Sequence, residues 1–361
     1  MKYRESLKQI KPYKPGLSED DIKKKYNLEN VIKLASNENP YGASKKLKNI
    51  FNDSQNIARY PDNYCTELRK KLSKKIGVSE GKLVFGNGSV EIIQMLSRIF
   101  IEKDDEVVTC TPTFQSYYLE TYIENGKVVS VPVLKDYKFN LNGILQKITN
   151  KTKMIYITNP NNPTGTIVEE SELIQFLEKV PKEICIILDE AYAEYVNNKN
   201  YPNSIKLLEK YKNICILKTF SKAYGLASFR IGYGIANEEI ITELEKVRVP
   251  FNISEIAQQA AIIALDDEEF LKDCKKNNRE VIEYVYGKLT EYKIGYIETE
   301  TNFIMIDTKK DSNDIAEKLQ QNGFIVRPGF PNMQTFIRVT IGTRDEMTQF
   351  VECLNKILKE N

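Results

Sequence analysis

The amino-acid sequence predicts an α/β protein in which a mostly parallel sheet forms the larger part of the fold. Short runs of Val, Ile and Leu recur through the middle of the chain, and amphipathic stretches separate them. Continuous apolar runs are typical of strands that helices cover on both faces, since a strand with one exposed face alternates apolar and polar residues. After about residue 237 the pattern changes to long charged helical stretches and a few further strands. We therefore expect a second, smaller α+β domain at the C-terminal end.

The individual elements follow from these runs and their spacing. The middle of the chain contains seven predicted strands, at 82–86, 106–110, 127–133, 153–158, 184–189, 213–218 and 230–236. Amphipathic patterns predict helices at 89–100, 169–180, 237–249, 254–289 and 312–320. The last of these lies among three further predicted strands, at 302–307, 323–328 and 336–341. These elements divide the chain into an N-terminal arm over 1–35, a large domain over 36–245 and a small domain over 246–361.

Charge and composition argue against several classes of partner. The 52 basic and 50 acidic residues nearly balance, so neither a nucleic acid nor an anionic membrane is the expected partner. No apolar run approaches the roughly 20 residues of a membrane span, and the first residues lack the apolar core of a signal peptide. The six cysteines are scattered without a C-x-x-C pair, which indicates a reduced, cytoplasmic protein.

The sequence contains no histidine, and this absence restricts the possible chemistry. It excludes Ser-His-Asp and Cys-His catalysis and every metal site that uses histidine ligands. Because the cysteines do not cluster either, we expect no metal site. An enzyme with this sequence would have to carry out acid–base chemistry with Lys, Tyr, Asp, Glu or a cofactor.

Two polar loops follow predicted strands, at the end of the sheet where open α/β sheets bind ligands. The stretch 86-GNGSVEII-93 places glycines between a strand and a helix, so that backbone N–H groups and the positive helix end face an anion such as phosphate. A plain helix cap by Ser89 explains this stretch equally well, and it matches neither a dinucleotide-binding nor a Walker loop. The stretch 158-TNPNNPTG-165 predicts a rigid loop that presents an asparagine amide, although an ordinary surface loop is the alternative.

The apolar run 184-ICIILDEAY-192 ends in a carboxylate. A carboxylate at the end of a buried strand costs several kcal/mol unless it is paired. Asp189 therefore needs a cationic partner, or it caps a helix. Tyr192 follows three residues later and can reach the same side of the sheet.

A single lysine, Lys222, follows the apolar run 213–220 and precedes the small and apolar residues 223–229. A poorly solvated lysine has a lowered pKa and becomes a usable amine nucleophile. Arg230 lies eight residues further on and supplies a guanidinium suited to bidentate phosphate binding. An amine, a buried carboxylate, a phosphate-binding loop and an asparagine amide are together the groups that pyridoxal phosphate requires.

On these residues the chain resembles fold-type I pyridoxal-phosphate aminotransferases, and within them the histidinol-phosphate aminotransferase branch. The resemblance runs nearly from end to end and implies the fold of that family, a large domain with a mostly parallel seven-stranded sheet and a smaller α+β domain. The matching stretches are 11-KPYKPG-16, 34-LASNENPYG-42, 59-RYPD-62, 86-GNGS-89, 159-NPNNPTG-165, 189-DEAY-192, 219-TFSKAYGLASFRIGYG-234, 247-VRVPFN-252 and 336-FIRVTIGT-343.

The resemblance implies roles for residues around the cofactor, pyridoxal 5'-phosphate. Lys222 would be the Schiff-base lysine and proton shuttle, and Asp189 would pair with the pyridinium nitrogen. Asn162 and Tyr192 would contact the ring oxygen, and an aromatic ring would stack on the cofactor at Phe114. The residues implied for the phosphate group are Gly88, Ser89, Ser221 and Arg230, and Val90 and Thr219 are also implied for cofactor binding. Tyr60 would reach the phosphate of the neighbouring subunit, which implies a homodimer.

The resemblance also implies a substrate site. Arg338 would bind the carboxylate of glutamate or 2-oxoglutarate and, together with Arg327 and Tyr13, the phosphate of histidinol phosphate. The remaining residues implied for substrate binding are Asn37, Tyr60 and Asn162. The implied reaction exchanges an amino group between histidinol phosphate and 2-oxoglutarate in histidine biosynthesis.

Two departures from the family pattern affect this interpretation. Val90 stands where the family usually has an acidic residue, at a position that acts mainly through its backbone. The segment 327–338 is about one residue shorter than usual and lacks the common aromatic–glycine–leucine turn. Since this segment adjoins the substrate arginines, an aromatic amino acid aminotransferase and a phospho-amino-acid decarboxylase of the same fold stay open as alternatives.

Two further alternatives belong to other functional classes. A non-catalytic module that binds pyridoxal phosphate would not need the intact set of Lys222, Asp189, Asn162 and Arg230. An NAD-binding oxidoreductase fits the alternation of strands and helices, but the sequence lacks a dinucleotide-binding glycine pattern after the first strand.

Overall fold

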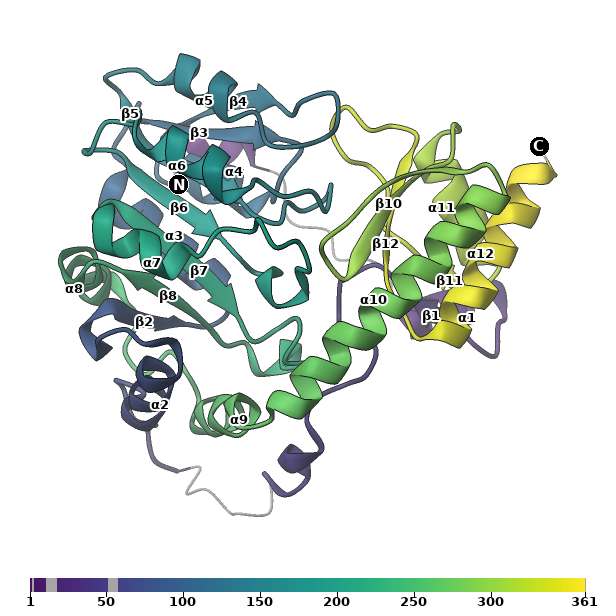
Figure 1. The fold of residues 1–361 in the computed structure, drawn as a ribbon, viewed down its shortest axis with the longest axis horizontal. Helices are drawn as coiled ribbons and strands as arrows, with labels where there is room; N and C mark the ends of the chain where they lie inside the picture. Colours follow the sequence, from purple (N-terminus) through teal and green to yellow (C-terminus); the bar gives the residue numbers. More distant parts are fainter. Residues whose placement is uncertain (2, 11–17, 51–57, 361) are drawn as a thin grey trace.

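The computed structural model describes residues 1–361 apart from 2, 11–17, 51–57 and 361 (Figure 1). Tyr13, which the sequence predicts to bind substrate, lies outside the described residues. In the described part of the chain the main sheet has seven strands, and all seven predicted strands are confirmed within two residues at their ends. They are β2 (Leu83–Gly86), β3 (Glu106–Thr111), β4 (Lys127–Pro132), β5 (Thr152–Thr158), β6 (Cys185–Asp189), β7 (Ile214–Thr219) and β8 (Gly232–Ala236).

The strand order in this sheet is β2-β8-β7-β6-β5-β3-β4. The neighbours from β7 to β4 pair in parallel, whereas β8 pairs antiparallel with both β7 and β2. The sheet is therefore mostly parallel, as the continuous apolar runs predict. Because β5, β6 and β7 are parallel neighbours, their carboxyl ends meet at one edge.

Helices cover both faces of the large sheet (Figure 1). Successive side chains of a strand point to opposite faces, and here they enter two different hydrophobic clusters. Ile155 and Ile157 of β5 belong to one cluster, while Met154 and Tyr156 belong to the other. Each of these four side chains has no exposed surface. Burial on both faces explains why the strand sequences are uniformly apolar instead of alternating.

The C-terminal part of the chain forms a second core around a smaller antiparallel sheet of order β12-β10-β9. Its strands are β9 (Gly295–Ile297), β10 (Phe303–Asp307) and β12 (Phe336–Thr340). The sequence did not predict β9. The predicted strand 323–328 is only β11 (Phe324–Ile325), and it pairs in parallel with β1 (Ile32–Lys33) instead of joining the small sheet. The end of the predicted arm thus packs on the second core through the buried side chain of Leu34.

The predicted helix 254–289 is wrong in its continuity, because it is divided into α9 (Glu255–Leu265) and α10 (Glu268–Glu291). Asp267 separates them and accepts a hydrogen bond from the N–H group of Phe270, as an N-cap residue does. Alanines of α9 pack in the core of the large sheet, whereas Val281 and Val285 of α10 pack in the second core. The boundary between residues 245 and 246 stays a prediction.

The remaining predicted helices are present with small shifts at their ends. They are α3 (Ser89–Phe100), α6 (Glu170–Leu177), α8 (Glu238–Val247) and α11 (Ser312–Gln321). Six helices were not predicted individually: α1 (Glu19–Tyr26), α2 (Thr66–Ile76), α4 (Ser116–Ile123), α5 (Leu141–Lys147), α7 (Ser204–Lys210) and α12 (Arg344–Lys359). Short 3₁₀ helices are η1 (Glu5–Gln9), η2 (Lys45–Asn49), η3 (Glu80–Lys82), η4 (Ala193–Tyr195) and η5 (Ala227–Phe229).

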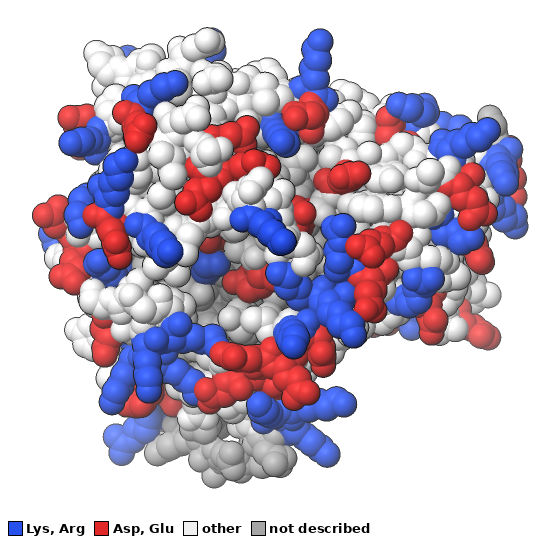
Figure 2. Space-filling view, in the orientation of Figure 1, with Lys and Arg blue, Asp and Glu red and all other residues white. Residues whose placement is uncertain are grey.

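Positive and negative side chains are interspersed over the face of the molecule shown in Figure 2. This distribution agrees with the nearly balanced numbers of basic and acidic residues in the sequence. Within the described part of the chain, no helix combines the length and the apolar character that crossing a membrane requires.

Candidate active site

The carboxyl ends of β6 and β7 bring the predicted carboxylate and amine to the same edge of the large sheet. Asp189 is the last residue of β6, and Lys222 follows β7 by three residues. The pairing of Asp189 with Leu217 shows that the two strands end side by side. The parallel topology therefore brings together residues that are 33 positions apart in the sequence.

The glycine loop and the Arg230 side chain lie next to each other. Helix α3 begins at Ser89, directly after Gly88, whose φ of 76° is unfavourable for any residue with a side chain. A Cβ atom at Gly88 would collide with the Arg230 guanidinium, so that this glycine permits the close approach of the arginine. Arg230 Nη1 donates to the carbonyl of Ala227 at 2.9 Å and to Ser221 Oγ at 3.4 Å.

Thr219 and Val90, the two further residues implied for cofactor binding, contribute in different ways. The hydroxyl of Thr219 accepts the N–H group of Ser221 at 3.0 Å and thereby fixes the turn before Lys222. Val90 lies in the first turn of α3 with a half-buried side chain. Its backbone N–H is among those that the start of a helix leaves without an intrahelical acceptor. The helix N-terminus, the Ser221 hydroxyl and the Arg230 guanidinium together suit a dianionic phosphate.

Asp189 is a buried carboxylate held by neutral donors. Its side chain accepts hydrogen bonds from Tyr117 Oη at 2.6 Å and from the N–H group of Ala191 at 3.2 Å. Burial raises its pKa despite these two bonds. No lysine or arginine forms an ion pair with Asp189 in the described ranges. The site thus offers a negative charge to a cation that the described residues do not provide.

Lys222 carries an amine with a lowered pKa. Burial lowers the pKa of Lys222 to about 8, and the positive charges of Arg338 and Arg230 act in the same direction. Lys222 Nζ donates to the carbonyl of Ser36 at 3.1 Å and lies 5.7 Å from the centre of the Tyr192 ring. A substantial neutral fraction near pH 8 makes this amine a competent nucleophile and base.

Tyr192 is held by two residues that lie far from it in the sequence. Asn37 Nδ2 donates to Tyr192 Oη at 2.9 Å, and Asn37 Oδ1 accepts from Thr340 Oγ1 at 3.1 Å. Asn37 is buried in a left-handed conformation, with a φ of 54°. Because the tyrosine oxygen already accepts from Asn37, its own hydrogen can be donated to an acceptor in the site.

The contacts of Asn37 add a function that the sequence did not predict, since they make this residue a support for Tyr192. Direct binding of substrate by Asn37 stays a prediction. Thr340 was not recognised as a site residue at all. The alternation of β12 contained the signal, because Thr340 lies two residues after Arg338 and therefore on the same face of the strand.

Arg338 connects the second core to the large sheet. Its Nη1 donates to Asn162 Oδ1 at 2.6 Å, and its Nη2 donates to the carbonyl of Ala35 at 2.7 Å. Its guanidinium lies 5.4 Å from the ring centre of Phe303 and 5.6 Å from that of Phe330. Only about 9% of Arg338 is exposed, so its charge acts in a poorly solvated environment.

Arg327 lies directly opposite Arg338 on the neighbouring chain segment. The two residues exchange backbone hydrogen bonds of 3.0 and 2.8 Å, the pattern of an opposed antiparallel pair. Side chains of such a pair project from the same face, and like charges directly opposite each other are destabilising. An anion between the two guanidinium groups would remove this repulsion.

The structure places the two remaining predicted residues, both aromatic, in different environments. Phe114 is half-buried and meets Tyr117 edge to face, with ring centres 5.6 Å apart. Since Tyr117 is bonded to Asp189, Phe114 belongs to the same neighbourhood. Tyr60 is 81% exposed and stacks on Phe251 with ring centres 4.6 Å apart.

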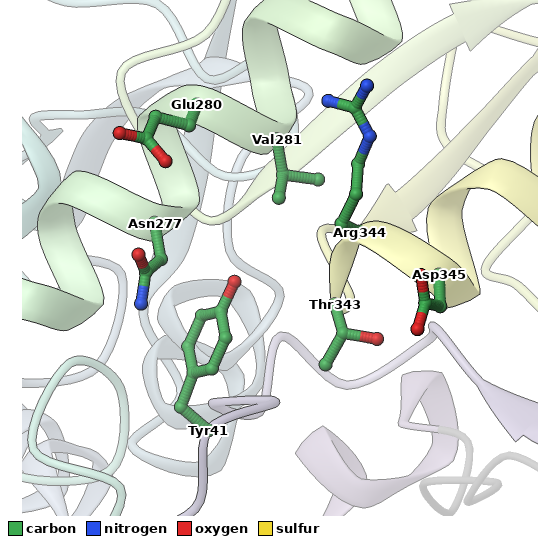
Figure 3. Close-up of a pocket in the computed structure, with 7 residues that line it drawn as sticks. All are labelled: Tyr41, Asn277, Glu280, Val281, Thr343, Arg344 and Asp345. Atoms are coloured by element: carbon green, nitrogen blue, oxygen red, sulfur yellow. The ribbon is translucent and has the colours of Figure 1, made fainter.

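A separate pocket of about 320 Å³ lies between α10, the start of α12 and Tyr41 (Figure 3). Its lining includes Glu280, Asp345 and Arg344, whose guanidinium stacks on the ring of Tyr284. None of the predicted site residues lines this pocket. The candidate active site is therefore identified by the hydrogen-bond donors around Arg230, the buried Asp189 and the lowered pKa of Lys222. The size of a cavity does not identify it.

The sequence pattern of the family described as aminotransferase class I and II matches residues 29–354. The chain belongs to this family. It is similar to the histidinol-phosphate aminotransferase of Caldicellulosiruptor saccharolyticus, with 44% identity over 99% of this chain and 100% of the relative. It is 43% identical to the histidinol-phosphate aminotransferase of Anoxybacillus flavithermus, over 100% of this chain and 97% of that protein.

A solved structure has the same fold. The histidinol-phosphate aminotransferase of Sinorhizobium meliloti, solved in complex with pyridoxal-5'-phosphate, superposes with a TM-score of 0.91. The superposition covers 99% of this chain and 98% of that one, at 24% sequence identity. This likeness shows the fold, including the large sheet and the second core.

Proposed function

We propose that this chain is a pyridoxal-phosphate-dependent aminotransferase of histidine biosynthesis. It exchanges an amino group between histidinol phosphate and 2-oxoglutarate, with imidazole-acetol phosphate and glutamate as the products. One observation carries the proposal, namely that three groups meet at one edge of the sheet. They are the Lys222 amine with its lowered pKa, the buried Asp189 carboxylate, which has no cationic partner among the described residues, and the N-terminus of α3, which suits an anion. The full-length similarity to two histidinol-phosphate aminotransferases supports the choice of substrate.

The residues at this edge fit the cofactor. Asp189 lacks a cationic partner in the described part of the chain, and a protonated pyridine nitrogen would supply one. The close approach that Gly88 permits brings the N-terminus of α3, Ser221 and Arg230 close together, and these groups suit a phosphate. Bound pyridoxal phosphate supplies an electron sink that stabilises negative charge at the substrate α-carbon.

The chain's own groups then perform the acid–base and orienting work. Lys222 Nζ would hold the cofactor and move a proton, for which a pKa near the working pH is most effective. Asp189 would favour a protonated ring nitrogen, because a carboxylate stabilises a neighbouring positive charge. Tyr192 has a hydrogen that it could donate to the ring oxygen, and Asn162 orients Arg338 through their 2.6 Å contact.

Substrate recognition rests on the opposed pair of Arg327 and Arg338. The pair offers two guanidinium groups on one face, which suits the phosphate of histidinol phosphate and the carboxylate of glutamate or 2-oxoglutarate in turn. One anion site for two substrates is what an exchange in two half-reactions requires. Tyr13 stays a predicted contributor to this site.

We further propose that the active unit is a homodimer in which Tyr60 reaches the cofactor phosphate of the partner subunit. The exposed aromatic rings of Tyr60, Tyr64 and Phe251 support this proposal, since exposed aromatic residues are enriched at protein interfaces. The division into an arm, a large domain and a small domain, and the cytoplasmic location, remain predictions of the same kind.

The test is a half-reaction followed by absorbance. The purified, cofactor-loaded protein is mixed separately with histidinol phosphate, glutamate, phenylalanine and phosphothreonine, and the visible band of the lysine-bound cofactor is recorded. We expect rapid loss of this band with histidinol phosphate and with glutamate. A band that phenylalanine bleaches and histidinol phosphate leaves unchanged would favour the aromatic aminotransferase, and release of carbon dioxide from phosphothreonine would favour the decarboxylase. A protein without any such band would contradict the cofactor assignment.

A further inference from the structure

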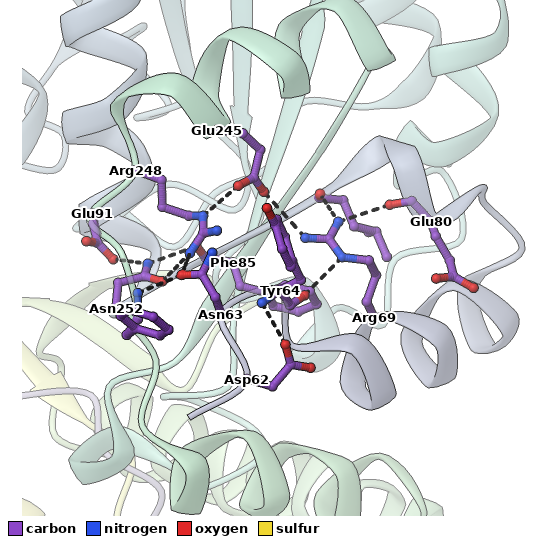
Figure 4. Close-up of polar contacts among 12 residues, drawn as sticks. Asp62, Asn63, Tyr64, Arg69, Glu80, Phe85, Glu91, Glu245, Arg248 and Asn252 are labelled. Atoms are coloured by element: carbon purple, nitrogen blue, oxygen red, sulfur yellow. Dashed lines mark hydrogen bonds and ion pairs between the residues drawn. The ribbon is translucent and has the colours of Figure 1, made fainter. Parts of the chain in front are cut away.

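A polar network runs from Asn63, three residues after Tyr60, through Arg248 and Asn252 to Glu91 in the first turn of α3 (Figure 4). The segment that carries Tyr60 and the glycine loop before α3 thus adjoin its two ends. We infer that Arg248 and Asn252 are positioning residues that connect these two ends within each chain. The inference rests on the proposed function, because it concerns how two cofactor phosphate sites are linked. The stretch 247–252 is among those that match the family, yet none of the roles described so far uses it.

At the first end, the network fixes the position of Tyr60. The Tyr60 ring stacks on Phe251, and the N–H group of Phe251 donates to Asn63 Oδ1 at 2.7 Å. The carboxylate of Asp62 accepts the N–H group of Thr66 at 2.6 Å and thereby holds the turn that follows Tyr60. An 81% exposed ring thus has a defined support beneath it.

At the centre, Arg248 joins several elements. Only about 6% of its side chain is exposed, and its charge is balanced by Glu245 at 2.7 Å. Arg248 Nη1 donates to Asn252 Oδ1 at 2.9 Å and also approaches Asn63 Oδ1 at 3.5 Å. A buried guanidinium with a fixed planar geometry holds these two asparagines in a definite relation, which a flexible lysine would not do.

At the second end, Asn252 contacts residues on both sides of the glycine loop. Asn252 Nδ2 donates to Glu91 Oε2 at 2.7 Å and to the carbonyl of Phe85 at 3.2 Å. Glu91 Oε2 also accepts the N–H group of Asn87, the residue directly before Gly88, at 2.5 Å. The network therefore holds both the strand end and the backbone from which the phosphate-binding loop begins.

The consequence follows from the position of the two ends. In the proposed homodimer, the glycine loop serves the chain's own cofactor, whereas Tyr60 serves the cofactor of the partner subunit. Arg248 and Asn252 therefore act on both active sites of the dimer at once. Loss of Asn252 should weaken cofactor binding in the site of its own chain and in the site of the partner.

Mixed dimers separate these two effects. A dimer of one intact chain and one Lys222→Ala chain has a single site that shows the visible band of the lysine-bound cofactor. In that site the glycine loop comes from the intact chain and Tyr60 from the Lys222→Ala chain. Asn252→Ala is placed in either chain, and the concentration of pyridoxal phosphate at half-maximal band intensity is measured. We expect an increase of about tenfold in both placements, which corresponds to the loss of about one hydrogen bond.

Three further variants keep the inference testable if Asn252→Ala does not fold. Asn63→Ala removes the acceptor of the Phe251 N–H group and of the longer Arg248 contact but leaves the bonds from Asn252 to Phe85 and Glu91. It should therefore weaken binding mainly when it is placed in the Lys222→Ala chain. Arg248→Lys keeps the charge but loses the planar geometry, and it should weaken binding in both placements. Lys246→Ala removes an exposed ion pair on the same helix and should change nothing.

The outcomes separate this inference from the proposed function. If the intact homodimer shows the cofactor band and the Lys222→Ala homodimer lacks it, the proposed cofactor role of Lys222 stands. An effect of Asn252→Ala that is confined to the intact chain would then overturn the coupling between the two sites. Absence of the band from the intact protein would overturn the proposed function, and this inference with it.

Discussion

The cofactor half and the substrate half of the candidate active site are assembled in different ways. Asp189 and Lys222 follow neighbouring strands of one sheet, so the local topology of β6 and β7 brings them together. Arg338 lies instead in the second core and reaches across to Ala35 and Asn162. The first half depends on a fold built from contiguous sequence, and the second depends on how distant parts of the chain pack.

The two halves also differ in electrostatics. Asp189 is a buried carboxylate held by neutral donors, an arrangement that suits the cationic ring nitrogen of the proposed cofactor. Arg338 and Arg327 form an opposed pair with positive charge on one face, which suits the anionic groups of the proposed substrates. The positive charges of Arg338 and Arg230 both contribute to the lowered pKa of Lys222. The substrate half therefore acts on the cofactor half through charge.

The largest expected effect concerns the cofactor half. Lys222→Ala should lower turnover by at least ~10³-fold, because the chain loses its proton-transfer group together with the amine that holds the cofactor. Stopped-flow absorbance with histidinol phosphate measures the loss, and circular dichroism checks the fold. Lys218→Ala is not a suitable control, because Lys218 is a buried partner of Glu190. Lys210→Ala is a suitable control, because Lys210 is exposed. Full activity of Lys222→Ala would refute the assignment.

Asp189→Asn tests the same half through charge alone. The amide keeps the size of the carboxylate but removes the negative charge beside the ring nitrogen, and we expect turnover to fall by ~10²–10³-fold. Binding of pyridoxal phosphate, measured by its absorbance, should persist because the donors for the phosphate are unchanged. Normal turnover in this variant would show that the carboxylate does not act on the cofactor.

Arg338→Ala tests the substrate half. Removal of this buried guanidinium should weaken histidinol phosphate and glutamate alike, by at least about 2 kcal/mol each in kcat/KM. Arg338→Lys retains a charge without the planar geometry. Its kcat/KM should lie between that of the unchanged protein and that of Arg338→Ala. If only one of the two substrates is affected, the two anions do not share this site.

A pH experiment tests whether the charge of Arg338 in the substrate half affects Lys222 in the cofactor half. The rate at which the cofactor-free protein captures pyridoxal phosphate should rise with pH and level off above about pH 8, where Lys222 is mostly neutral. The lowered pKa of Lys222 also makes the free energy of unfolding depend on pH, because the folded protein binds fewer protons than the unfolded chain between about pH 8 and 10.5. Below pH 8 the buried charge of Lys222 lowers the free energy of unfolding by its full amount. This loss disappears as the pH rises to about 10.5. Arg338→Gln should move the inflection of the capture rate to higher pH. An unchanged inflection would show that the two charges do not interact.

The smallest expected effect concerns the link between the halves. Thr340→Val keeps the shape of the side chain but removes the hydroxyl that bonds to Asn37, and the free energy of unfolding should fall by about 1 kcal/mol. Turnover should fall several-fold, since Asn37 then holds Tyr192 less firmly. Thermal unfolding and steady-state rates measure the two effects. Thr348→Val, on the exposed side of α12, is a matched control.

Local sequence patterns were enough to predict the strands of the large sheet and to single out the residues proposed for the cofactor half. Each buried strand is a continuous apolar run, because helices cover both of its faces and every residue faces a core. Asp189 and Lys222 were conspicuous for the same reason, since a charged residue directly after such a run enters poorly solvated surroundings. The glycine before Ser89 and the position of Arg230 after Lys222 were equally visible as local patterns.

Contacts between segments that are far apart in the sequence depend instead on how the whole chain packs. The pairing of β1 with β11 and the bonds from Asn37 to Tyr192 and Thr340 carry no local pattern. A pair such as Asn37 and Thr340 is separated by 303 residues, and nothing in either neighbourhood specifies the other. Periodicity reports which face of an element is buried, whereas the partner on that face is chosen by packing of the whole chain.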